Sequence, residues 1–245
     1  MTFTGRGRKR SSGWRNWTFD SPRKEQYFRR MKRVPLFPLG LVLLPRMPLP
    51  LHIFEERYKE MFGRCIHDDE PFGIVLQTGS TFQQTGSLAR IETVINRYVD
   101  GRLDVLTTGT DRFRIHEIYR DKAYLEAEVE LFQDDPIDET NKRRVQELVR
   151  SAVSGLQEYA RVTGYAVDTE VIENLDYEEL SFLMATTSVF STREKQELLE
   201  LRCTETRIKR AARALDESRR HREMEPRVRE LLGLPRDEDL HWLFN

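Results

Sequence analysis

The stretch Phe37–Ile66 has the sequence FPLGLVLLPRMPLPLHIFEERYKEMFGRCI, and its pattern changes half-way. The first half is apolar but is interrupted by prolines at positions 38, 45, 48 and 50. Proline lacks a backbone N–H and disrupts a helix from within, so we expect no helix here, and strands only at sheet edges, strand starts or bulges. The second half predicts a short amphipathic helix, because its apolar residues recur at helical spacing between charged ones: Phe54, Tyr58, Met61, Phe62, Cys65 and Ile66.

The charge of the chain is unevenly distributed. The 245 residues are 33% charged with a formal net charge of −1, and no apolar run approaches the roughly 18 residues that span a bilayer. Residues 1–33 carry eleven Lys and Arg against two acidic residues, whereas the remainder carries 29 against 39. We therefore expect a basic tail, an acidic body and no membrane partner.

The two cysteines, Cys65 and Cys203, are too few for a disulfide framework or a zinc site. Cys65 falls on the apolar face of the predicted helix, where a buried free thiol is expected. The basic start is not followed by the apolar region of a signal peptide. Together these features predict a cytoplasmic protein.

Residues 1–30 are rich in Arg, Gly and Ser and show neither helical nor strand periodicity, so a disordered tail is predicted. Aromatic residues alternate with its arginines, a mixture that can stack on single-stranded nucleic acid. Met31 opens MKRVPLFPLG just before the first expected strand and is an alternative start. On that interpretation the tail is a dispensable or spurious extension.

The region after the predicted helix indicates short strands joined by turns. A polar loop is expected at Thr78–Ser87, a hairpin turn at Asp100-Gly101, and a further turn at Gly109. In the last strand Glu126, Glu128 and Glu130 alternate with apolar residues and form the expected solvent face. The pattern favours a small antiparallel barrel or sandwich ending near Phe132, with these strands: Phe72–Gln77, Leu88–Val99, Leu103–Thr108, Phe113–Tyr119 and Tyr124–Phe132.

Beyond Pro136 the period is helical. Asp176 with Glu179 and Ser191 with Glu194 have the spacing of capping boxes, and Gly164 is expected to end the first long helix. Met224–Leu232 is interpreted as a separate short helix. The acidic group before the helices, formed by Asp134, Asp135, Asp138 and Glu139, is expected to be a solvated linker. The predicted regions are a tail at 1–30, a barrel domain at 31–134, a helical bundle domain at 138–232 and a C-terminal tail at 233–245.

No motif for catalysis, metal ligation or phosphate binding is present in the sequence. The five histidines are scattered without metal-site spacing, and neither a phosphate-loop nor a G-x-S-x-G motif occurs. For His52 a structural hydrogen bond is expected. We therefore expect no enzyme activity, no metal and no cofactor.

Two phrases of the sequence resemble the substrate-binding (N-terminal) domain of the Lon protease. The first is L-H-I-F-E-x-R-Y, carried here by Leu51, His52, Ile53, Phe54, Glu55, Arg57 and Tyr58. The second runs from a G-x-x-A strand through a D-G-R turn to G-x-x-R-F-R-I, carried by Gly86, Ala89, Asp100, Gly101, Arg102, Gly109, Arg112, Phe113, Arg114 and Ile115. The resemblance covers about residues 31–220. It implies an α+β fold, with a PUA-like β pseudobarrel that has one early helix and is followed by an α-helical bundle.

In that family an ATPase and a protease module follow; this chain stops at Asn245 and shows neither, so ATP use and proteolysis are not expected. The resemblance implies a non-enzymatic protein that binds exposed apolar or unfolded polypeptide segments, as an adaptor or quality-control factor. A separate protease or chaperone could be a further partner. The alternative is a PUA-like RNA-binding or other nucleic-acid-binding protein, although the acidic body disfavours nucleic acid except through residues 1–30.

The motif residues are interpreted as structural: Pro50, His52, Phe54, Glu55, Arg57, Tyr58, Gly101, Gly109, Arg112 and Phe113. Among them Glu55 and Arg57 are expected to clamp the proline-rich stretch to the barrel, while Phe54 and Tyr58 face the core. The polypeptide is expected to bind an exposed apolar patch between barrel and bundle, formed by Met47, Leu49 and the loop 78–86 that contains Phe82.

Overall fold

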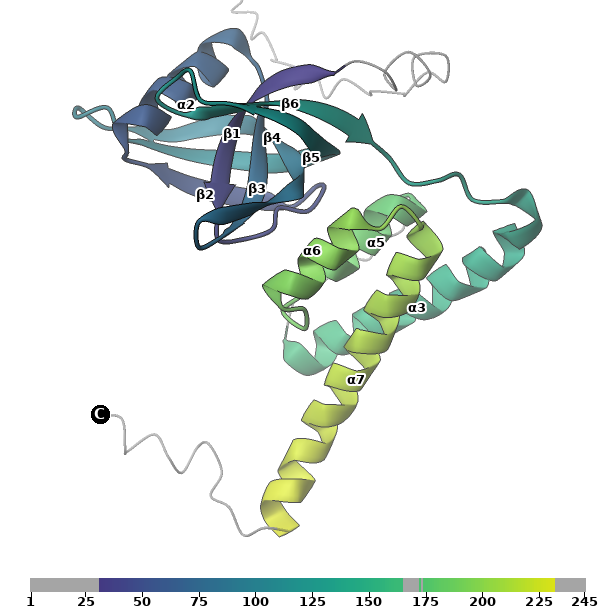
Figure 1. Cartoon of the computed structure of the whole chain (residues 1–245). Helices are drawn as coiled ribbons and strands as arrows, with labels where there is room; N and C mark the ends of the chain where they lie inside the picture. Colours follow the sequence, from purple (N-terminus) through teal and green to yellow (C-terminus); the bar gives the residue numbers. More distant parts are fainter. Residues whose placement is uncertain (1–30, 165–171, 173, 232–245) are drawn as a thin grey trace, which may run out of the picture. The chain divides into compact units, whose positions relative to one another are not determined.

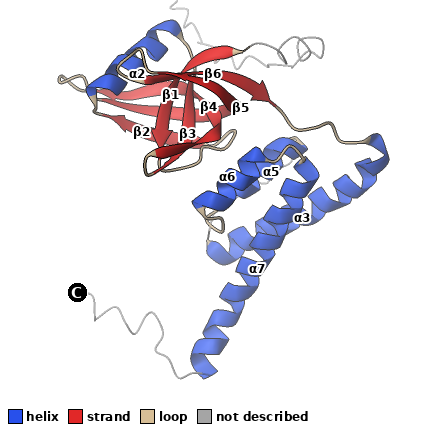
Figure 2. Ribbon diagram, in the orientation of Figure 1, coloured by secondary structure: helices blue, strands red, loops and turns tan. Residues whose placement is uncertain are grey.

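The computed structural model describes residues 31–164, 172 and 174–231. The predictions for the tails at 1–30 and 233–245 lie outside these residues. Across the described part the chain is a mixed α+β fold, with a β barrel followed by helices (Figures 1 and 2).

Six strands form one sheet in the order β2-β5-β4-β3-β1-β6, and a further pairing of β5 with β6 closes the barrel. The pairs are antiparallel except for β1 with β3. The predicted barrel is therefore confirmed, with one parallel pair that the sequence did not indicate. The strands are β1 Lys32–Leu39, β2 Pro48–Ile53, β3 Phe72–Thr78, β4 Thr81–Arg97, β5 Leu103–Tyr119 and β6 Leu125–Phe132.

The prolines occupy positions where a missing N–H does little harm. β1 pairs with β6 through residues 32–36 and with β3 through residues 36–39. Pro35 and Pro38 therefore each lie in a part of β1 that has a neighbouring strand on one side only, as in an edge strand. Pro48 begins β2, and Pro50 lies within it; β2 is an end strand of the sheet. This placement confirms the expectation drawn from the sequence.

Helix α2 (Glu56–Asp68) buries its apolar face in the core of the barrel. Phe62 packs against Phe72 with ring centroids 4.7 Å apart, and Phe37 packs against both rings. Cys65 is buried among them, and burial raises the pKa of its thiol to about 11. The predicted helix and its buried free thiol are both confirmed.

Two predictions about the strands are wrong. Thr78–Ser87 is not a polar loop, because β3 and β4 pair as a hairpin up to Thr78 and Thr81. Gly109 does not turn the chain, because β5 runs through it. Glycine is needed there for close approach: an added Cβ would lie 2.3 Å from the Leu44 carbonyl oxygen, and the Gly109 N–H donates to the Met47 carbonyl at 3.0 Å.

The helical part begins with the short η2 (Glu139–Asn141) and continues with α3 (Lys142–Thr163), α5 (Tyr177–Ala185), α6 (Thr192–Glu200) and α7 (Thr204–Leu231). Both capping boxes are present, and Gly164 ends α3 with φ 73°. The expected separate helix at Met224–Leu232 is wrong, because α7 is continuous; residues 216–224 include no glycine or proline to interrupt it. No described helix is both long and apolar enough to cross a membrane.

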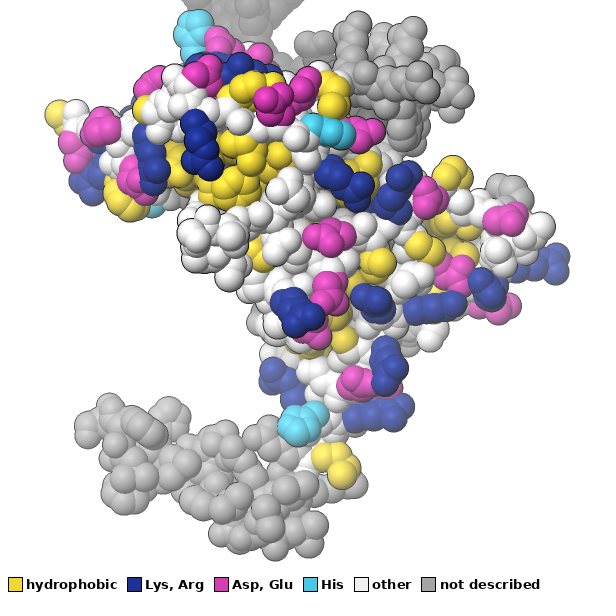
Figure 3. All heavy atoms as spheres, in the orientation of Figure 1, with side chains coloured by type: hydrophobic (Ala, Val, Ile, Leu, Met, Phe, Trp, Pro, Cys, Tyr) yellow, Lys and Arg dark blue, Asp and Glu magenta, His cyan; other side chains and the backbone are white. Residues whose placement is uncertain are grey.

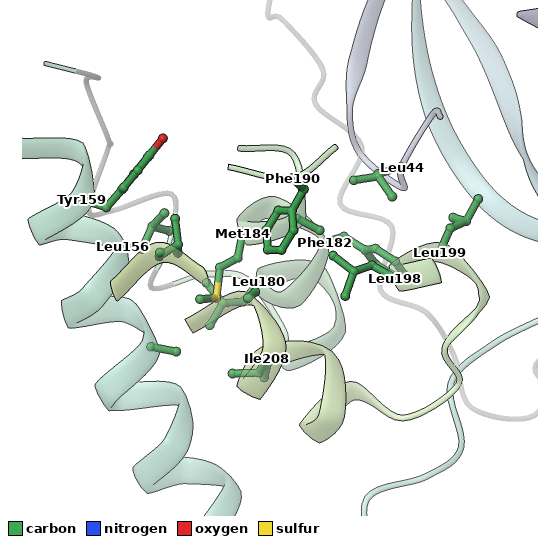
Figure 4. Packing of buried hydrophobic residues seen from close by; sticks show 14 of the residues in the cluster. Leu44, Leu156, Tyr159, Leu180, Phe182, Met184, Phe190, Leu198, Leu199 and Ile208 are labelled. Carbon is green, nitrogen blue, oxygen red and sulfur yellow. The ribbon is translucent and has the colours of Figure 1, made fainter. Parts of the chain in front are cut away.

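The bundle core also includes side chains from the barrel. Leu44, from the segment between β1 and β2, belongs to the same hydrophobic cluster as Leu198 and Leu199 of α6 (Figure 4). Val42 and Leu76 belong to it as well. One apolar core therefore includes residues from both sides of the predicted domain boundary at residues 134–138. The division into two domains stays a prediction.

Candidate functional site

Most of the motif residues lie in or beside two places in the fold. One is the end of the barrel where β2 leads into α2, next to the turn between β4 and β5; we call this the hairpin tip and define it as residues 52–54 and 95–104. The other is the contact between the barrel and the helices around Arg112, which we call the junction. The two places use similar chemistry in different surroundings.

At the hairpin tip, Asp104 connects three neighbouring strands. Its carboxylate lies 2.6 Å from His52 Nδ1 and accepts hydrogen bonds from Asn96 Nδ2 at 3.0 Å and the Tyr98 hydroxyl at 2.7 Å. These hydrogen bonds lower the pKa of Asp104 to about 2. The hydrogen bond expected for His52 is therefore present, and Asp104 fixes the side chains around it.

Phe54 is exposed at this tip, so the prediction that it faces the core is wrong. Its side chain is 60% exposed and stacks on the His52 ring at 6.0 Å. The reason is the helix start: Glu55 is the N-cap in an extended conformation, so Phe54 lies outside the helical period. Tyr58, one turn later, does contact the core through Phe37 at 4.5 Å.

The prediction that Glu55 and Arg57 clamp the proline-rich stretch to the barrel is also wrong. The two residues pair with each other at 2.7 Å on the surface, and the Arg57 guanidinium lies over the Tyr58 ring. Lys59 makes the longer-range contact instead, donating to the Asp100 carbonyl at 2.8 Å. Gly101 completes that turn with φ 83°, as the hairpin prediction requires.

At the junction, Arg112 of β5 reaches from the barrel to the helices. Its guanidinium donates to the carbonyls of Leu199 at 3.0 Å and Leu201 at 2.6 Å, and to Glu178 at 3.1 Å. It also pairs with Asp134 at 2.5 Å and lies near the rings of Phe132 and Phe182. Its buried position supports the structural role expected for it. Phe113 is likewise fully buried, in the barrel core.

The partner of Arg112 overturns another prediction, because Asp134 is not part of a solvated linker. Its side chain is 4% exposed and accepts hydrogen bonds from Arg112, Arg207 and Thr204. Burial alone would raise the pKa of Asp134, but the hydrogen bonds and charge of Arg207 and its neighbours lower it below the ordinary value. Arg207 is fully buried and also donates to Ser181 at 2.7 Å.

The sequence that forms the barrel and the junction matches a known protein family. The family model described as the ATP-dependent protease La (LON) substrate-binding domain matches residues 33–217, which is most of the chain.

The chain belongs to the Lon substrate-binding domain family.

Individual relatives are distant. The chain is 24% identical over 196 residues to Lon protease 2 of Herpetosiphon aurantiacus, covering 75% of this chain and 24% of the relative. It is 26% identical over 180 residues to the Lon protease of Escherichia coli K12, covering 69% and 22%. This chain thus spans about a quarter of the length of the curated relatives it matches.

Two solved structures share the fold. The crystal structure of a Lon N-terminal domain protein from Xanthomonas campestris has a TM-score of 0.54 at 23% identity, covering 74% of this chain and 96% of that one. The N-terminal domain of the Mycobacterium avium complex Lon protease has a TM-score of 0.59 at 18% identity, covering 76% and 98%. The fold implied by the resemblance is confirmed.

In this Lon-type barrel the glutamate row of β6 is not uniformly solvated. Glu126 is buried, and its carboxylate pairs with Arg33, Arg64 and Lys122, each at 2.8 Å. The expectation of a solvent face is wrong at this position, because Arg64 of α2 and two other cations cover it. Glu130 is exposed, as expected, and pairs with His116 at 3.0 Å.

The three residues expected to bind polypeptide do not gather on one surface. Leu49 is 8% exposed and packs in the barrel core around α2. Met47 is partly buried against that core and the bundle core, whereas Phe82 packs on a different barrel cluster. Their role in binding stays a prediction.

The exposed apolar side chains of this Lon-family chain are concentrated elsewhere. Phe54, Ile95, Tyr98 and Val99 lie at the hairpin tip, and the other large exposed apolar residues of the described part are Met31 and Met224. Figure 3 shows charged side chains of both signs spread over the helical part and hydrophobic ones gathered on the barrel. Ile95, Tyr98 and Val99 were not singled out from the sequence, although the Asp-Gly turn beside them was predicted.

Proposed function

We propose that this chain binds exposed apolar or unfolded segments of other polypeptides and has no catalytic step of its own. Membership of the Lon substrate-binding domain family over residues 33–217 carries the proposal. Proteolysis is not part of it, because the matched region is the substrate-binding part of the relatives. No group of three His, Cys, Asp or Glu in the described part is arranged to hold a metal ion.

Charge supports a polypeptide ligand over nucleic acid. Residues 34–245 carry 29 Lys and Arg against 39 Asp and Glu, so most of the chain has the sign that repels phosphate. Many surface arginines are also paired with carboxylates, as Arg144 is with Glu205 and Arg213 with Glu217. The exposed apolar side chains of the barrel remain as the groups that a ligand would cover.

The same proposal makes the chain an adaptor or quality-control factor that retains a client for a separate protease or chaperone. The test uses the full chain and one probe protein in two forms: native with its disulfides, and permanently unfolded by reduction and carboxymethylation. We expect the unfolded form to bind at least about tenfold more tightly by fluorescence anisotropy. Equal affinity for the two forms, or no binding of either, would overturn the proposal.

A further inference from the structure

We propose that the hairpin tip is the surface on which the apolar polypeptide segment docks, an inference that rests on the proposed function. The exposed groups come from adjacent strands: His52 of β2 is the cross-strand partner of Asp104 of β5, which is also the partner of Asn96 of β4. Phe54 follows directly on β2, and Tyr98 and Val99 follow directly on β4. The apolar side chains thus extend from one three-strand platform.

The platform is organised before any ligand arrives. Asp104 holds His52, Asn96 and Tyr98, and Tyr98 in turn meets the His52 ring edge-on at 6.0 Å. The turn is closed by Tyr98 N–H donating to the Arg102 carbonyl at 2.9 Å. Rings that are already fixed lose little conformational freedom on binding, which favours affinity.

The charges around the tip select an uncharged occupant. Arg57 pairs with Glu55, Lys59 with Glu56 and Arg102 with Asp100, at 2.7 Å in each case. Arg97 is the remaining Lys or Arg in residues 52–59 and 95–104, the tip and the start of α2. Because three of the four basic side chains are already neutralised, neither an acidic peptide nor a nucleic acid finds a complementary field. A segment with aliphatic or aromatic side chains and little charge is the ligand that this surface complements.

Single exposed apolar residues are ordinary on protein surfaces, but a cluster of them marks an interaction site. Phe54 and Ile95 are 60% and 55% exposed, and Val99 is fully exposed. Met224 of α7 has the same exposure as Ile95, and it lies on a different element. It therefore provides a matched control for removing an exposed apolar side chain.

The experiment compares the full chain with the double variant Phe54→Ser/Val99→Ser and with Met224→Ser, using the carboxymethylated unfolded probe. We expect the tip variant to bind at least about tenfold more weakly and Met224→Ser to stay within about twofold of the unchanged protein. Val99→Ser alone, at a fully exposed turn position, provides a second variant that does not depend on how Phe54 supports the fold; we expect a smaller loss of the same sign.

Three outcomes separate the hypotheses. If the unchanged chain does not bind the probe, the proposed function fails. If it binds and both tip variants bind the probe as tightly as the unchanged chain, the docking site is elsewhere and this inference is overturned. If sedimentation velocity shows a dimer that the tip variants dissociate while probe binding persists, the tip contacts a second copy of the chain, which also overturns the inference.

Discussion

Asp104 at the hairpin tip and Asp134 at the junction each accept hydrogen bonds from three side chains, yet the two carboxylates do different work. Asp104 is partly exposed and is held by His52, Asn96 and Tyr98. Asp134 is buried between two arginines. Water can replace a lost partner at the tip but not at the junction, so one network orients a surface and the other holds barrel and helices together.

The largest effect is expected from Asp134→Ala. It leaves the buried guanidiniums of Arg112 and Arg207 without their shared carboxylate, and removing one partner of a buried ion pair costs about 3–5 kcal/mol. The measurement is the free energy of unfolding in urea. Asp135→Ala is the matched control, because Asp135 is adjacent in sequence but pairs with Arg202 at the surface. Equal stability of the two variants would mean that the buried carboxylate of the junction contributes no more than a surface ion pair.

Two glycines of β5 and its turn repeat the contrast on a smaller scale. At Gly109 an added methyl group meets the Leu44 carbonyl, and forcing atoms into a filled space costs about 1–3 kcal/mol. At Gly101 an added methyl group meets only the end of the Lys59 side chain at 3.5 Å, so the cost is that of positive φ, about 1–2 kcal/mol. The free energy of unfolding in urea measures the cost of Gly109→Ala and of Gly101→Ala. A larger cost for Gly101→Ala would show that the segment before β2, which contains Leu44, moves to accommodate the added methyl group.

Local signals in the sequence predicted most of the fold. The alternation in the strands, the Asp-Gly turn and the two capping boxes each act within a few residues. The turn and both boxes formed as expected, whereas β4 begins earlier than predicted and β5 runs through Gly109. The networks were not predictable in this way. Asp134 lies 73 residues from Arg207, and Glu126 lies 62 residues from Arg64, so both carboxylates have the local appearance of solvent-facing residues.

The candidate site was predicted less well for a related reason. Phe54 continues the helical spacing of α2 in the sequence, but capping at Glu55 removes it from the helix and exposes it. Leu49 shows the opposite error: it was expected at an exposed patch, but in β2 its side chain points into the core. A shift of one or two residues at an element boundary decides which apolar side chains a ligand can contact.

The contribution of Asp104 to stability is expected to depend on pH. The pKa of Asp104 is about 2, below the ordinary value of about 3.9, so its stabilising effect is complete above about pH 4 and is lost as the pH falls toward 2. Asp104→Asn removes this share, and the urea midpoints of the variant and the unchanged protein should converge between pH 4 and 2. Asp134, whose pKa is also lowered, remains in both proteins. Curves that keep a constant offset over this range would mean that ionisation of Asp104 contributes nothing to stability.

The smallest effect is expected from salt acting on binding at the tip. A site that contacts 6–10 phosphates loses about 10³–10⁵ in affinity between about 50 and 200 mM salt. Three of the four basic side chains in and beside the tip are already paired, so the affinity for the carboxymethylated probe should change by less than about twofold over that range. The probe carries added carboxylates, so an uncharged apolar peptide serves as its control. A steep loss with the carboxymethylated probe would show that charge drives its binding at the tip. An unchanged affinity for the uncharged peptide leaves apolar contact as the source of binding.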